Sequence, residues 1–219
     1  MSRKTPETPN AEASGPQASV PVLLGRPNPQ GKGAVGLLDD WAASQPTRVV
    51  AKGPAQLLAD YFTALLVLSS SFRFKPVKRQ TYHLYFHDRD WNLSLVSPDE
   101  WGTEERQDGY VGACVLHDDA TWTIEPSSNL GQPGPVSDAL SAAYAGFIER
   151  LNSGADLETT LPVYAGQMPY QQRLLASVLS RSLTGSMRAA GLSGLSTDAW
   201  LELLPGNSTQ LLGDIGDET

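Results

Sequence analysis

The side chains of this sequence best suited to metal binding or proton transfer are its three histidines. His83 and His87 lie in the stretch TYHLYFHDRDWNLSLVSPDEWG at residues 81–102, and the third, His117, precedes two aspartates. A cross-strand site of His83, His87 and Asp119 is therefore one hypothesis, and it would make the protein an enzyme. Four positions of extended chain, at about 3.3 Å each, separate two histidines by roughly 13 Å, which is too far for one ion. We expect no metal site and no cofactor.

A second candidate site is the stretch FRFKPVKR at residues 72–79, in which aromatic and basic residues alternate. Such a strip could hold phosphates while bases stack on its rings, and Tyr85, expected to be exposed on the polar face of its strand, could extend it. Alternatively, the rings pack inside and the cations pair with nearby acids. The net charge of −8 opposes broad attraction to nucleic acid. The predicted binding residues are Arg73, Lys75, Lys78, Arg79 and Tyr85.

Other features of the sequence argue against particular functions. SPDE at residues 97–100 fits a capping box, which explains its two carboxylates without catalysis. GRPNPQGKG at residues 25–33 lacks the spacing of a phosphate-binding loop. The single cysteine, Cys114, rules out an intramolecular disulfide and favours a reducing compartment, and we expect a cytoplasmic protein. The apolar run at residues 64–68 is too short to span a membrane, and no membrane association is expected.

The periodicity of apolar residues predicts an α+β fold. From Pro54 onward the spacing is helical, which predicts a helix over residues 54–70. The period then changes to two in four short stretches, around residues 82–86, 91–95, 111–115 and 122–124. These stretches predict a four-stranded antiparallel meander with one apolar face, which the helix covers.

The rest of the chain divides by composition. Three amphipathic stretches after residue 135 predict helices, the first capped by Ser137, the second following Pro169 and the third starting at Ser196. They form either a small bundle or a cover for the sheet. The predicted parts are a disordered tail (1–20), an arm with a short helix (21–53), a helix-and-sheet module (54–126), a linker (127–135), a helical segment (136–206) and a flexible tail (207–219).

Three motifs in order give a family resemblance. TYHLYF, LSLVSPDEWG and VGACVLHDDATWTIEP, between residues 76 and 126, resemble an uncharacterised family known only as a domain of unknown function. Its hairpin pattern has a histidine before Thr-Trp, where this chain has Ala120. The resemblance implies a sheet module and no particular activity.

We therefore favour a binding or scaffold function with a protein partner over catalysis. The alternatives are an enzyme using His83, His87 and Asp119, and nucleic-acid binding through the basic strip. Self-association through the apolar faces of residues 136–151 and 170–190 would make a homo-oligomer.

Overall fold

The structure is a computed structural model that describes residues 32–101, 108–153, 157, 169–206 and 208–212. The predicted tail at residues 1–20 and the start of the arm lie outside the described residues. The chain forms two compact units, residues 1–37 and 38–219. Helix α1 (Lys32–Ser44) begins in the first unit, and all other described elements belong to the second.

The sheet consists of β1 (Thr81–His87), β2 (Asp90–Ser94), β3 (Tyr110–Leu116) and β4 (Trp122–Pro126). Every neighbouring pair is antiparallel, as predicted, but the strand order is β2-β1-β3-β4. The predicted meander order is therefore wrong, because β2 and β3 flank β1 on opposite sides. A two-residue turn, with φ of 52° at Asp88 and 66° at Arg89, folds β2 back onto β1. The following connection then carries the chain across to the other side of β1.

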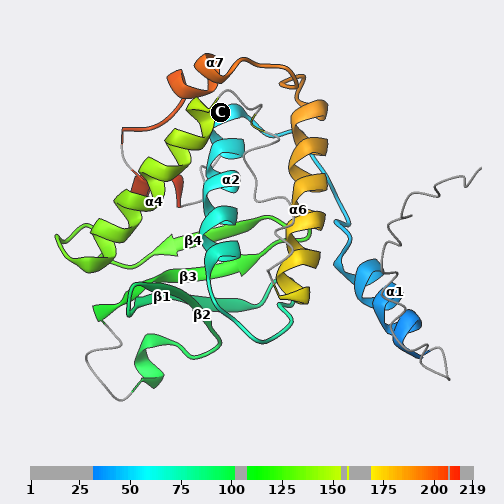
Figure 1. Ribbon diagram of the computed structural model, residues 1–219, viewed down its shortest axis with the longest axis horizontal. Coiled ribbons are helices and arrows are strands. Elements are labelled where there is room, and N and C mark those ends of the chain that lie inside the picture. Colours follow the sequence, from blue (N-terminus) through cyan, green and yellow to red (C-terminus); the bar gives the residue numbers. More distant parts are fainter. Residues whose placement is uncertain (1–31, 102–107, 154–156, 158–168, 207, 213–219) are drawn as a thin grey trace, which may run out of the picture. The chain divides into compact units, whose positions relative to one another are not determined.

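Helix α2 (Pro54–Ser69) is the centre of the core. It is apolar almost all round, and such a helix is stable only when packed on several sides. The sheet covers one side, while α4 (Pro135–Asn152) and α6 (Tyr170–Ala189) lie beside it on the same face of the sheet (Figure 1). The predicted helix that covers the sheet is thus confirmed.

One face of the sheet packs against α2. Its residues Tyr82, Leu84, Trp122 and Ile124 are at most 1% exposed. Cys114 lies between Tyr82 and Ile124 in the register, and burial raises the pKa of its thiol. This cysteine is therefore a small core residue and not a reactive thiolate.

The C-terminal part of unit 38–219 adds α4, α6, the short α7 (Thr197–Glu202) and a 3₁₀ turn, η2 (Ser208–Leu211). The helix predicted to start at Ser196 is α7, and Ser196 is its N-cap, accepting a hydrogen bond from Ala199 N at 3.3 Å. The predicted cap at Ser137 is wrong. Helix α4 already begins at Pro135, and the Ser137 hydroxyl accepts from Gly134 N at 3.0 Å.

The flexible tail expected from residue 207 is wrong for residues 208–212. Leu211 and Leu212 are fully buried in the core. Ile124 N on the outer edge of β4 donates to Leu212 O at 3.1 Å. Two leucines and one β-type hydrogen bond therefore fix this segment against the sheet.

The predicted capping box at residues 97–100 is confirmed. It starts a 3₁₀ turn, η1 (Pro98–Glu100), where a Glu100 carboxylate oxygen accepts from Ser97 N at 2.8 Å and Ser97 Oγ at 3.0 Å. Both bonds lower the pKa of Glu100. Within the described residues, no helix is both long and apolar enough to cross a membrane.

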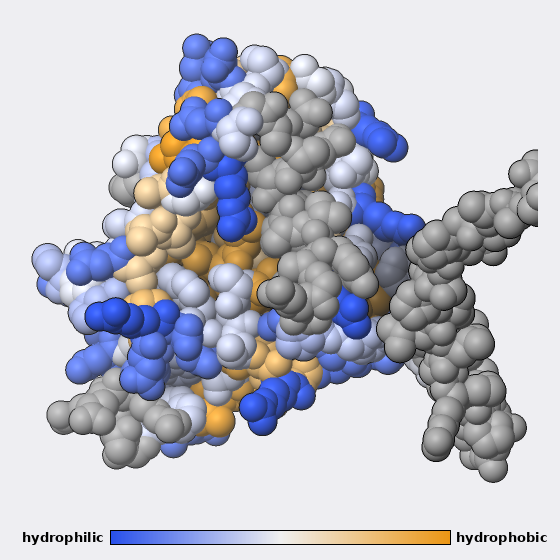
Figure 2. Space-filling model, in the orientation of Figure 1, coloured by the Kyte–Doolittle hydropathy of each residue, from blue (hydrophilic) through white to orange (hydrophobic). Residues whose placement is uncertain are grey.

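The apolar face of α6 packs against the rest of the chain, so little of this face is open to a second copy of the protein. Its residues Val178, Leu179 and Leu183 are at most 2% exposed. Hydrophobic residues do reach the surface between α4 and α2 (Figure 2). There a groove of about 500 Å³ is lined by Phe62, Leu65, Ala143, Gly146 and Phe147, among others.

Candidate functional site

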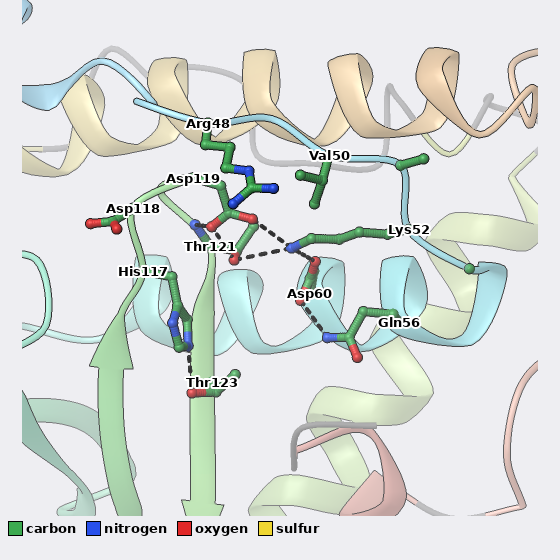
Figure 3. Close-up of a pocket in the computed structure, with 12 residues that line it drawn as sticks. Arg48, Val50, Lys52, Gln56, Asp60, His117, Asp118, Asp119, Thr121 and Thr123 are labelled. Atoms are coloured by element: carbon green, nitrogen blue, oxygen red, sulfur yellow. Dashed lines mark hydrogen bonds and ion pairs between the residues drawn. The ribbon is translucent and has the colours of Figure 1, made fainter. Parts of the chain in front are cut away.

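A buried cluster of charges lies where the chain enters α2. Lys52 Nζ is 2.6 Å from a carboxylate oxygen of Asp60 and 2.7 Å from one of Asp119 (Figure 3). Asp60 is 1% exposed and Asp119 is 8% exposed. The Thr121 hydroxyl donates to Asp119 at 2.6 Å and lies 3.3 Å from Lys52 Nζ. We call these four residues, Lys52, Asp60, Asp119 and Thr121, the lysine–aspartate cluster.

Three separate elements position this cluster. Asp60 sits in the second turn of α2, and Gln56, one turn earlier, donates to its other oxygen at 2.9 Å. Asp119 belongs to the β3–β4 turn, where it also accepts from Thr121 N at 3.1 Å. Lys52 comes from the segment 45–53. In this segment Thr47 N donates a hydrogen bond to Asp118 O at 3.0 Å, which connects the segment to the β3–β4 turn.

Burial and the polar contacts together shift the pKa values of the two carboxylates in opposite directions. Burial raises the pKa of Asp60, and the contact with Lys52 only partly offsets it. Burial also opposes ionisation of Asp119, but hydrogen bonds from Lys52 and Thr121 hold its pKa below the usual value. Lys52 loses hydration, yet the two carboxylates raise its pKa overall. With both carboxylates ionised, two acids against one ammonium give the cluster a formal net negative charge.

The cluster forms one wall of a cavity of about 590 Å³. Arg48, from the segment above, projects its guanidinium into this cavity toward Asp119 and Thr121 (Figure 3). Arg48 is exposed and makes none of the ion pairs found in the described part of the chain. On the opposite wall, His117 Nε2 lies 2.8 Å from Thr123 Oγ1. The cavity thus has the two carboxylates of the lysine–aspartate cluster on one wall and the guanidinium of Arg48 at its mouth.

The structure does not bring the three predicted catalytic candidates together. His83 Nδ1 lies 3.3 Å from the Tyr110 hydroxyl on the sheet. His87 lines a different cavity, beside Gly109, and Asp119 belongs to the lysine–aspartate cluster. Among the residues that the structure describes, no group of three or more histidine, cysteine or acidic side chains could hold a metal ion.

Most of the basic strip is engaged within the chain. Lys75 pairs with Asp40 at 2.5 Å, Lys78 donates to Gln45 O at 2.8 Å, and Arg79 pairs with Asp118. Arg73 is exposed. Phe72 is buried, and Phe74 stacks on the Tyr82 ring with 5.3 Å between centroids. The rings therefore serve the core, and three of the four cations have polar partners.

The expectation that Tyr85 is exposed is wrong, because it is only 3% exposed. Trp101, just after η1, approaches its ring edge-on at 6.2 Å, and Tyr110 lies at 5.3 Å between centroids. The Tyr85 hydroxyl donates to Val96 O at 3.0 Å. Together with His83, whose ring lies 5.9 Å from Tyr110, these residues form an aromatic layer on the sheet face opposite α2. We call His83, Tyr85, Trp101 and Tyr110 the aromatic platform.

Two exposed acids border the aromatic platform. Burial lowers the pKa of His83, although the nearby Glu100 and Asp99 oppose that change. Burial, followed by the proximity of Tyr85, raises the pKa of Tyr110 to about 12. His83 is therefore neutral near pH 7 and Tyr110 keeps its proton. Within the described residues, neither Asp99 nor Glu100 takes part in an ion pair.

Sequence reasoning missed the lysine–aspartate cluster. Its one readable signal is Asp60, a carboxylate in the middle of the apolar helical run LLADYF. Such a residue must be paired when the helix is buried. Lys52 lies only eight residues before Asp60, but nothing in the sequence marks it as the partner, and Asp119 follows Lys52 by more than sixty residues.

One comparison with known proteins gives a match. The model of the family described as Protein of unknown function (DUF2452) matches residues 64–132. The match spans the sheet and the last turns of α2, from residue 64, and it confirms the resemblance predicted over residues 76–126. Neither a curated protein nor a solved structure matches the chain. The match to this family model therefore covers all four strands and the aromatic platform.

Proposed function

We propose that the protein is a non-enzymatic binding module that recognises a basic segment of a protein partner on the aromatic platform. The observation that carries this proposal is the aromatic layer on the sheet face opposite α2, bordered by the exposed carboxylates of Asp99 and Glu100. The whole platform lies inside the matched domain, residues 64–132.

The chemistry of the platform suits arginine or lysine. Trp101 and Tyr110 are partly exposed, and a tyrosine or tryptophan ring attracts a guanidinium or ammonium group by about 0.5–1 kcal/mol at exposed sites. Tyr85, which is only 3% exposed, supports these two rings by direct contact. Asp99 and Glu100 add carboxylates that no cation of the described chain neutralises. A protein with a net charge of −8 also attracts a basic segment over a longer range. Guanidinium groups, which stack and form paired hydrogen bonds, fit best.

Two observations disfavour the alternatives. Phosphates on the platform would meet the charges of Asp99 and Glu100, and the basic strip at residues 72–79 is mostly engaged elsewhere. For catalysis, a base needs a reacting partner within hydrogen-bond reach. In the described part of the chain, His83 hydrogen-bonds with the Tyr110 hydroxyl, whose raised pKa makes it a poor proton donor.

Fluorescence anisotropy of the full-length protein with a labelled arginine–glycine repeat peptide tests the proposal. The charge-reversed variant Asp99→Lys with Glu125→Lys removes two exposed acids near Tyr110 while leaving the Ser97–Glu100 cap intact. We expect it to weaken binding at least about tenfold. The matched control, Glu149→Lys with Glu202→Lys, makes the same charge change at exposed sites on α4 and α7 and should bind like the natural protein.

Equal losses in the two variants would show a nonspecific charge effect and overturn the proposal. Tighter binding of a single-stranded oligonucleotide than of the peptide would also overturn it, in favour of nucleic acid as the partner. Native mass spectrometry of the protein from its own cells, with and without nuclease, adds the mass of the physiological partner. In that measurement, a complex containing only a second copy of the chain would contradict a separate protein partner.

A cytoplasmic site of action belongs to the same proposal. It is supported by the cysteine usage of the chain, whose single thiol, Cys114, is buried in the core. Fractionation of cells that express the tagged full-length protein tests it, and recovery in another compartment would contradict it.

A further inference from the structure

We propose that the cavity beside the lysine–aspartate cluster binds a free α-amino acid, with the ammonium group at Asp119 and the carboxylate at Arg48. This site is separate from the aromatic platform and does not depend on the function proposed for it. It rests on the placement of opposite charges within one cavity of about 590 Å³. That volume lies within the ~300–1,000 Å³ typical of small-molecule sites.

The ammonium end of the ligand is defined by an imbalance of buried charge. Lys52 sits between two carboxylates, so one negative charge in the cluster has no counterpart. An uncompensated buried charge is costly, and a second cation placed beside it would relieve that cost. Asp119 is the more exposed of the two acids, and a carboxylate offers about four acceptor sites, of which the described contacts use three. An incoming ammonium group can therefore bind Asp119 while Lys52 stays in place.

The carboxylate end of the ligand is defined by Arg48. Its guanidinium points into the cavity over the cluster, and no ion pair within the described chain engages it (Figure 3). A guanidinium binds a carboxylate through two parallel hydrogen bonds. The ammonium group of a simple amine would be attracted by the cluster and repelled by Arg48. The carboxylate of a simple acid would be attracted by Arg48 and repelled by Asp119. A zwitterion alone satisfies both ends.

The remaining walls leave room for a side chain. Val50, Ala51 and Gly53 form an apolar rim, while His117 and Thr123 line the opposite side. Val50 is 39% exposed, so the rim is open to solvent. A small aliphatic side chain would lie against Val50, and a larger one would extend out of the cavity.

The experiment measures binding of L-alanine to the full-length protein by isothermal titration calorimetry, with alaninamide and propionate as half-ligands. Alaninamide keeps the ammonium without the carboxylate, and propionate keeps the carboxylate without the ammonium. We expect L-alanine to bind at least about tenfold more tightly than either. No heat from L-alanine at millimolar concentration, or equal binding of alaninamide, would overturn the proposal.

Arg48→Gln is the decisive variant, because Arg48 is exposed and its replacement leaves the buried cluster intact. We expect it to weaken L-alanine binding at least about tenfold and to leave alaninamide binding equal or stronger. Arg188→Gln, at an exposed position on α6 outside the cavity, should change neither. Unchanged L-alanine binding in Arg48→Gln would overturn the assignment of Arg48, and the site with it.

Discussion

Two adjacent aspartates in the β3–β4 turn show how differently one residue type can be used. Asp118 points outward and pairs with Arg79, and the two side chains are 38% and 78% exposed. Asp119 points inward and pairs with Lys52, where the side chains are 11% and 13% exposed. Partners lower the pKa of both acids, yet burial opposes that change far more strongly at Asp119.

The difference teaches that burial decides what an ion pair does. An exposed pair exchanges hydration for a contact of similar strength, so it contributes little. A buried pair has already lost its hydration, so removing one partner leaves a charge with nothing to solvate it. Segment 45–53 is therefore held to the core by the Lys52 contacts much more than by any surface pair. The following substitutions test this comparison.

The largest effect should come from Lys52→Met, which removes the cation and leaves Asp60 and Asp119 buried together. We expect a loss of about 3–5 kcal/mol in the free energy of unfolding. Urea denaturation monitored by circular dichroism measures this loss. A loss no larger than that of an average surface substitution would mean that water or another cation already solvates the two acids.

A smaller and unequal pair of effects should come from Asp119→Asn and Asp60→Asn. Asp119 is held ionised by its partners, so its amide should cost about 1–3 kcal/mol near pH 7. Asp60 has a raised pKa, so its charge already weakens the folded state, and Asp60→Asn should cost less. The same urea titration compares the two. The reverse ranking would contradict the electrostatic description of the cluster.

The pH dependence of stability should separate the same two acids. The lowered pKa of Asp119 stabilises the fold above its ordinary pKa of 3.8, and this contribution is lost as the pH falls further. The raised pKa of Asp60 acts with the opposite sign, so stability decreases as the pH rises from 3.8 through the folded value. We expect Asp119→Asn to flatten the first change and Asp60→Asn the second. Urea midpoints between about pH 3 and about pH 7 measure both, and slopes unaltered in the variants would refute the assignment.

The smallest effect should come from Arg79→Gln, which breaks the exposed pair with Asp118. Both partners are open to solvent, so we expect no measurable change in the urea midpoint. The turn itself is held by backbone bonds, including Ala120 N to His117 O at 3.0 Å, which this substitution does not touch. A shift comparable to that of Lys52→Met would remove the contrast between the two aspartates.

Local patterns predicted the elements of this fold well because their signals lie within a few residues. The alternation of Tyr82, Leu84 and Phe86 defines a strand with one buried face, and Pro54 marks the start of α2. The strand order could not be read in the same way. It depends on where a long connection carries the chain, and consecutive strands are neighbours only about two-thirds of the time.

The candidate sites were less predictable because they combine distant residues. Tyr85 lies on the strand face opposite the apolar one, and rings that include Trp101 and Tyr110, both distant in sequence, surround and bury it. The residues of the aromatic platform are therefore present in the sequence without any local pattern that marks them as one surface. In the lysine–aspartate cluster, Lys52 has the sequence context of an ordinary surface lysine, and only the fold places it between two acids.

The two edges of the sheet affect how readily the protein aggregates at high concentration. Ser71 bonds to the outer edge of β2, and Leu212 O accepts from the outer edge of β4. Unprotected edge strands readily pair with other chains and nucleate aggregation. The segment that contains the buried Leu211 and Leu212 thus covers the outer edge of β4 and keeps it from pairing with another chain. A chain shortened before Ser208 would expose that edge, and precipitation rather than loss of binding should be its first visible defect.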